Sequence, residues 1–144
     1  MYKSVLVATD GSETAGEAVR IALELAKTFG AKLHVVSVYQ AGTKGARRIS
    51  EMTGAYPGSV DSLSIADTLL EGIAANAHTQ GVETETYATS GTVADRIVSV
   101  AEEQQVELIV VGNKGMKGAK RILGSVPNAV AHSAPCAVLI VNTT

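Results

Sequence analysis

The chain has 144 residues, the length of one domain, and 46% of them are hydrophobic, so it can bury a core without disulfides. Aromatic residues make up 3% and tryptophan is absent, which argues against a module that stacks single-stranded nucleic acid on rings. The net charge is −2, no signal-peptide pattern opens the chain and no apolar run reaches ~20 residues; we therefore expect a cytoplasmic protein that binds neither nucleic acid nor membranes.

The first predicted elements are a strand at residues 4–8 and a helix from Ala15 to Phe29. The strand is a short apolar run followed by the turn Thr9-Asp10-Gly11-Ser12. Apolar residues in the next segment recur at i, i+3, i+4 and i+7, which indicates one buried helical face. Ser12 or Thr14 provides the N-terminal cap.

A second strand, a long loop and a second helix follow. Residues 33–39 predict the strand, in which His34 is interpreted as a strand residue because no His or Cys nearby would complete a metal site. The segment 40–58 contains four glycines and no hydrophobic period, so we expect a mobile or functional loop. Apolar residues on one face predict a helix around 66–77.

The third strand and third helix differ in character from the first ones. Acidic residues alternate with Thr or Tyr at 83–89, as in an exposed strand at a sheet edge. Thr92 opens the helix and forms a predicted capping box with Asp95, while Ile97 points inward. The following strand, 108–111, is apolar throughout and is predicted to be buried on both faces.

The last part of the chain combines a glycine-rich loop with a short helix and a final strand. The loop spans 112–124, and Ser125 is the predicted cap of a helix that ends near Ala134. The strand at 136–141 is apolar and uncharged. Its first residue, Cys136, is interpreted as a small buried hydrophobic side chain.

Alternating strands and helices with apolar strands predict an α/β domain over residues 1–144, a doubly wound parallel sheet with helices on both faces. Ligands of such sheets bind at the carboxyl ends of the strands, where the strand order reverses. The first and fourth predicted strands are neighbours at that point. The turn after the first strand and the glycine loop after the fourth are therefore expected to converge there.

The glycine-rich loop has the properties of a phosphate site. Glycines let backbone N–H groups approach an anion, and the loop leads through Gly124 and Ser125 into a helix N-terminus, which favours phosphate. All 14 acidic residues lie at or before Glu107, whereas the segment after it carries only cations: Lys114, Lys117, Lys120 and Arg121. The loop is neither a Walker A motif nor a dinucleotide fingerprint.

Asp10, at the end of the first strand, has two interpretations. Its carboxylate can accept a hydrogen bond from an amino or hydroxyl group of a ligand. It can equally stabilise the turn that follows it, because aspartate often accepts from the backbone two residues on. Both interpretations stay open at the level of sequence.

Together these motifs resemble the universal stress protein family over essentially the whole chain. The resemblance rests on Val-Ala-Thr9-Asp10-Gly11-Ser12, on Gly112-Asn-Lys-Gly115 with Gly124-Ser125-Val126, and on the closing Pro135-Cys-Ala-Val-Leu-Ile-Val. It implies the strand order 3-2-1-4-5, ATP binding and a homodimer that pairs strand 136–141. The loop between Gly115 and Gly124 is one residue shorter than is usual in the family, and Ala8 stands where some nucleotide binders have proline.

The family pattern also implies where the parts of the nucleotide lie. Adenine is expected near Ala8, Asp10 and Val38, ribose near Asp10 and Gly112, and phosphates along the loop. The complete candidate site consists of Ala8, Thr9, Asp10, Val38, Gly112, Lys114, Gly115, Gly124, Ser125 and Val126.

The leading functional hypothesis is an ATP-binding stress or signalling protein without efficient catalysis. The loop has no carboxylate that would act as a general base or hold a metal, so Mg²⁺ would be held mainly by the phosphates. The alternatives are a slow ATPase, a protein that binds AMP or cyclic AMP, and a dimeric interaction protein that needs no nucleotide.

Overall fold

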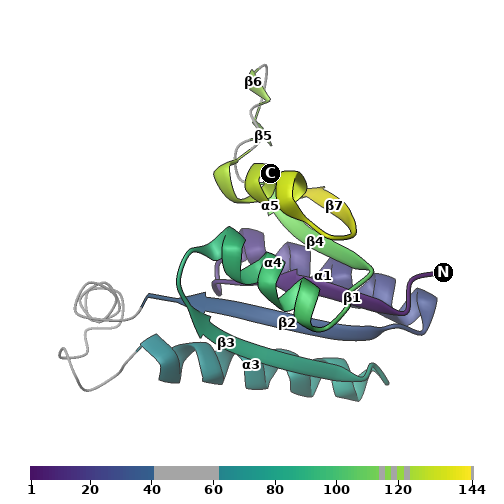
Figure 1. Ribbon diagram of the computed structural model, residues 1–144. Coiled ribbons are helices and arrows are strands. Elements are labelled where there is room, and N and C mark those ends of the chain that lie inside the picture. The colour runs from purple at the N-terminus through teal and green to yellow at the C-terminus, as the bar shows by residue number, and fades with distance from the viewer. Residues whose placement is uncertain (41–61, 114–115, 118–119, 122–123, 144) are drawn as a thin grey trace.

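One parallel sheet is the main feature of the computed structural model (Figure 1). The model describes residues 1–40, 62–113, 116–117, 120–121 and 124–143. Its strands are β1 (Ser4–Ala8), β2 (Lys32–Tyr39), β3 (Thr84–Ser90), β4 (Leu108–Asn113) and β7 (Ala137–Asn142). The helices are α1 (Glu13–Phe29), α3 (Ser62–Thr79), α4 (Val93–Glu103) and α5 (Ser125–Ser133). None of the helices in the described ranges is long and apolar enough to cross a membrane.

The strand order is β3-β2-β1-β4-β7, which confirms the predicted order 3-2-1-4-5. All four neighbouring pairs are parallel. Val5 of β1 pairs with Leu33 of β2 on one side and with Leu108 of β4 on the other. The order reverses at β1, so the carboxyl ends of β1 and β4 form the predicted place for a ligand.

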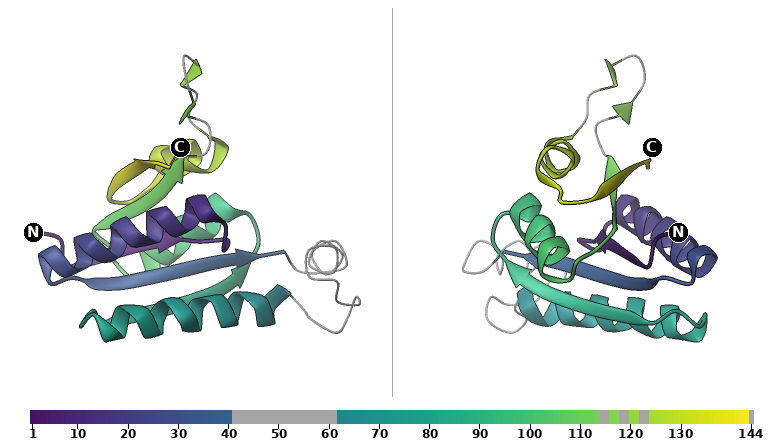
Figure 2. Two further views of the ribbon diagram at one scale, coloured as in Figure 1. Left: turned by 180° about the vertical axis from the view of Figure 1, so that it is seen from behind. Right: turned by 45° about the vertical axis from the view of Figure 1, so that its right-hand side comes forward.

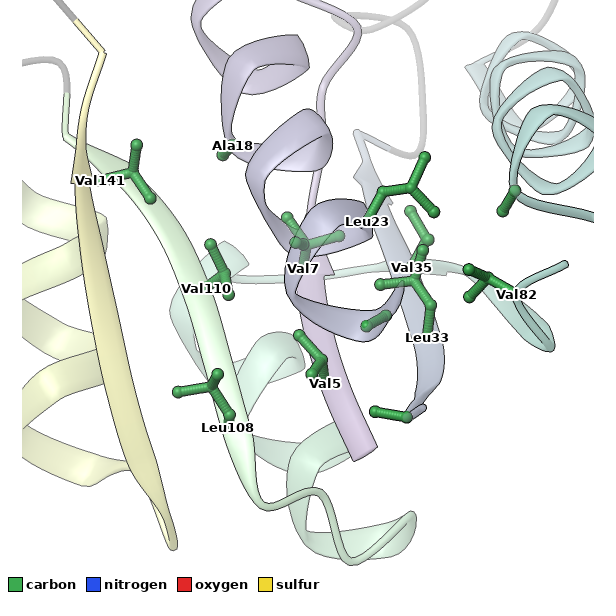
Figure 3. Packing of buried hydrophobic residues seen from close by; sticks show 14 of the residues in the cluster. Val5, Val7, Ala18, Leu23, Leu33, Val35, Val82, Leu108, Val110 and Val141 are labelled. Carbon is green, nitrogen blue, oxygen red and sulfur yellow. The ribbon is translucent and has the colours of Figure 1, made fainter. Parts of the chain in front are cut away.

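Helices cover both faces of this sheet (Figures 1 and 2). α1 and α3 pack on one face, and α4 and α5 pack on the other. Because successive strand residues point to opposite faces, each apolar strand contributes to two cores. Figure 3 shows the core under α1, where Val5, Val7, Leu33, Val35 and Val110 meet Ala18 and Leu23. The opposite core contains Leu6, Val36, Ile97, Ile109 and Val130.

The residues at which α1 and α4 begin differ in part from the sequence prediction. Ser12 and not Thr14 caps α1, since its side-chain oxygen accepts a hydrogen bond from the backbone N–H of Ala15 at 3.2 Å. Thr92 occupies the N-cap position of α4, but its side chain makes no capping hydrogen bond, so the predicted capping box is wrong.

The start of α5 also differs from the prediction. Gly124 occupies the N-cap position with extended backbone angles, and Ser125 is the first helical residue. The Gly124 N–H is bonded to the side chain of Asn113, a residue on β4, so a distant partner holds this helix end in place of a local serine cap.

Two predictions about the final third of the chain need correction. The segment between Gly112 and Gly124 contains a separate antiparallel pair, β5 (Met116–Lys117) with β6 (Lys120–Arg121), where we expected a loop throughout. Cys136 precedes β7 and is half-buried, not fully buried; burial raises the pKa of its thiol. The prediction of a mobile loop concerns residues that lie almost entirely outside the described ranges.

Candidate functional site

A pocket of about 460 Å³ opens at the carboxyl ends of the strands, where β1 meets β4. It is bounded by the ends of β1, β2 and β4 and by the first turns of α1, α4 and α5. The residues that line it are Ala8, Thr9, Asp10, Thr14, Ala15, Val38, Val93, Ile97, Val111, Gly112, Gly124, Ser125, Val126 and Pro127. The pocket therefore lies at the position that the reversal of strand order predicts.

The floor of the pocket begins with the turn after β1. The Thr9 N–H donates to the carbonyl of Val36 at 2.9 Å, which continues the β1–β2 pairing by one residue. Asp10 Oδ1 then accepts from the Ser12 N–H at 2.9 Å. Gly11 between them has a φ of 84°, a left-handed conformation that glycine adopts without steric cost. Of the two interpretations of Asp10, the structure therefore contains the turn, and the carboxylate borders the pocket as well.

One wall of the pocket is apolar. Val38 of β2, Val111 of β4, and Val93 and Ile97 of α4 contribute it. The two α4 residues are four positions apart and so lie on the same face of that helix. Side chains of this kind provide a surface of low polarity for one face of a planar ring.

The amino end of α5 also lines the pocket. The first N–H groups of a helix have no acceptor within the helix, and the helix dipole makes this end favourable for an anion. Pro127 has no N–H, and that of Gly124 is bonded to Asn113. The donors that the first turn presents to a ligand are therefore the N–H groups of Ser125 and Val126, together with the Ser125 hydroxyl.

The structure brings together most of the site residues expected from the sequence. Eight of them line the pocket: Ala8, Thr9, Asp10, Val38, Gly112, Gly124, Ser125 and Val126. The other two, Lys114 and Gly115, lie outside the described residues. Asp10 is the one acidic residue among the described lining, and the described ranges contain no group of three side chains suited to hold a metal ion.

Sequence reasoning missed the walls contributed by α1 and α4. Thr14 and Ala15 at the start of α1, and Val93 and Ile97 in α4, line the pocket. Ile97 was interpreted as a core residue because its spacing fits an inward helical face, and it does belong to the core. The sequence did contain a signal for these residues, because α1 and α4 each follow a strand. In a parallel sheet, the first turn of such a helix lies at the carboxyl edge of the strands.

A second polar cluster lies apart from the pocket, on β2 and β3. The Tyr87 hydroxyl donates to Glu85 Oε2 at 2.7 Å, so its oxygen accepts from His34 Nδ1–H at 2.8 Å, and Lys32 Nζ donates to Glu85 Oε1 at 2.8 Å. Burial lowers the pKa of His34 and raises that of Tyr87. His34 is 3% exposed, which confirms it as a strand residue packed in the sheet.

Comparison with known proteins gives consistent results over the whole length. A family described as the Universal stress protein family matches residues 1–142. A universal stress protein of Bacillus subtilis is 34% identical over 150 residues, which cover 98% of this chain and 99% of the relative. One of Mycobacterium tuberculosis is 35% identical over 145 residues, covering 99% and 98% respectively. A solved universal stress protein in complex with cAMP is 30% identical with a TM-score of 0.72, covering 99% of this chain and 98% of that one.

Proposed function

This chain belongs to the universal stress protein family, and from that premise we propose that it binds an adenine nucleotide, foremost ATP, in the pocket at the ends of β1 and β4. The observation that carries the proposal is the pairing, within one pocket, of an apolar wall with a helix N-terminus. The wall suits the base, and the helix end suits the phosphates. The structural relative solved with cAMP supports an adenine ligand.

We propose a binding role without efficient catalysis. Hydrolysis of a phosphoanhydride needs a positioned water molecule and usually a general base and a metal. Asp10 is the one carboxylate among the described lining residues, and it already holds the turn to Ser12. Mg²⁺ would accordingly arrive with the nucleotide and be coordinated mainly by phosphate oxygens and water.

The test is calorimetric titration with ATP, AMP, cyclic AMP and GTP, preceded by mass spectrometry of the small molecules released when the purified protein is denatured. We expect adenine nucleotides to bind and GTP to bind more weakly. The variant Ala15→Leu places a larger side chain at the pocket lining and should weaken ATP binding at least tenfold.

Ala75→Leu provides the matched control, because it makes the same change on an exposed position of α3. This variant should bind ATP like the wild type. Wild-type protein that binds no adenine nucleotide at millimolar concentration would contradict the proposal. Equal ATP affinity in Ala15→Leu and the wild type would place the ligand elsewhere.

We further propose a homodimer through β7. Among the described strands β7 is an edge of the sheet and pairs with β4 alone, and Leu139 in its middle is 38% exposed. An uncharged apolar edge strand invites pairing with another strand, most simply with its own copy across a two-fold axis. Leu139→Lys should therefore shift the protein from dimer to monomer in light scattering.

Thr86→Lys, on the exposed edge strand β3, is the control for the dimer and should leave it intact. A wild type that is monomeric at micromolar concentration would remove the dimer proposal. It would leave the proposal of nucleotide binding untouched.

A further inference from the structure

We propose that Asn113 is a positioning residue that holds the amino end of α5 in the geometry that receives the phosphates of the nucleotide. The inference rests on the proposed function and adds to it a residue that does not itself line the pocket. It concerns the two ends of the glycine-rich segment, where β4 finishes and α5 begins.

The Asn113 side chain joins these two ends. It is completely buried, and its Oδ1 accepts a hydrogen bond from the backbone N–H of Gly124 at 2.8 Å. The two residues are 11 positions apart in the chain. This contact therefore links the start of α5 directly to the last residue of β4.

Asn113 is itself held firmly. It pairs with Asn142 in the register between β4 and β7, and its backbone carbonyl accepts from the Thr143 hydroxyl at 3.3 Å. These contacts fix the backbone of Asn113, and the complete burial of its side chain in a close-packed interior restricts rotation of that side chain. The Gly124 N–H is thus bonded to a rigid acceptor.

The consequence for binding follows from the donors of α5. Gly124 has no side chain to cap the helix, and the N–H groups of Ser125 and Val126 come immediately after it. Their direction depends on where Gly124 is held. Donors arranged before the ligand arrives bind more tightly than donors that must be ordered on binding. The apolar wall from β2 and α4 does not depend on this contact, so phosphate affinity and base affinity should respond differently.

The experiment compares the dissociation constants of ATP and of adenosine for the full chain by calorimetry. Asn113→Ala removes the acceptor, and Asn113→Leu removes it while keeping a side chain of similar size. Both should weaken ATP binding about tenfold, the effect of one lost hydrogen bond with a fixed partner. Adenosine, which lacks phosphates, should bind within about twofold of the wild type. Asn128→Ala, an exposed asparagine of α5, is the control and should change neither constant.

A milder variant keeps the test decisive if a buried substitution prevents folding. Thr143→Val deletes the hydroxyl that bonds the Asn113 carbonyl and should weaken ATP binding about threefold without affecting adenosine. An unchanged ratio of the two constants in the folded variants would overturn the inference. A variant that binds ATP and adenosine more weakly by the same factor also leaves this ratio unchanged and indicates general damage to the fold. Failure of the wild type to bind ATP would instead refute the proposed function.

Discussion

Gly112 offers a sharp test of the packing beneath the pocket. A Cβ added at this residue would lie 3.1 Å from Thr143 Cγ2, and 3.6 Å from both Ala18 Cβ and the Thr14 carbonyl oxygen. Carbon atoms in favourable contact are about 3.5–4.0 Å apart, so the contact with Thr143 is too close and the other two are acceptable. The φ of Gly112 is not in the left-handed region, so alanine adds steric overlap without backbone strain.

Two opposing effects determine how much Gly112→Ala changes the free energy of unfolding. Overpacking in a buried site costs about 1–3 kcal/mol, and here the low end applies because a single side chain near the end of the chain has to move. Replacing glycine by alanine recovers about 0.4–1 kcal/mol through the lower entropy of the unfolded chain. We therefore expect Gly112→Ala to lower the free energy of unfolding by about 1 kcal/mol or less.

A double-mutant cycle with Thr143→Ser isolates the overlap. Serine lacks Cγ2 but keeps the hydroxyl that bonds the Asn113 carbonyl, so in this background Gly112→Ala should be neutral or stabilising. The interaction energy between the two changes should be about 1 kcal/mol. Urea denaturation of the four proteins at one concentration, followed by circular dichroism, measures it. Equal costs of Gly112→Ala in both backgrounds would refute this account of the pocket floor.

Three further predictions concern charge and pH. Because burial lowers the pKa of His34, the unfolded chain binds a proton more readily, and the free energy of unfolding should fall as pH drops below about 6.5. His34→Gln should flatten this slope below about pH 6.5 in denaturation curves; an unchanged slope would assign the pH dependence to other groups. Asp10→Asn should preserve the turn, since an amide oxygen still accepts from the Ser12 N–H, whereas Asp10→Ala should lower the melting temperature as well as ATP affinity. Neutralising the three lysines between Gly112 and Gly124 should weaken ATP binding and flatten its salt dependence in calorimetry; unaltered affinity at low salt would assign them to a solvated surface.

Local patterns in the sequence were sufficient for the five strands of the sheet, the four helices that cover it and their α/β class, but not for the short pair β5 and β6. Strands and helices follow from hydrophobic spacing, which a short window of residues carries by itself. The apolar run ending at Val111 and the glycine that follows it also mark the carboxyl edge of the sheet. These patterns predicted the edge of the sheet at which a ligand would bind, whereas the strand order and pocket residues such as Ala8 and Val38 were implied by the resemblance to the universal stress protein family.

The tertiary structure decided the contacts between residues that are distant in the chain. His34 and Tyr87 are 53 positions apart in the chain, and Asn113 and Gly124 are 11 positions apart. No local pattern encodes such pairs, because they depend on how strands align and where helices start in space. For the same reason the sequence pointed to Ser125 as the cap of α5, whereas the folded chain holds that helix end through a buried asparagine on β4.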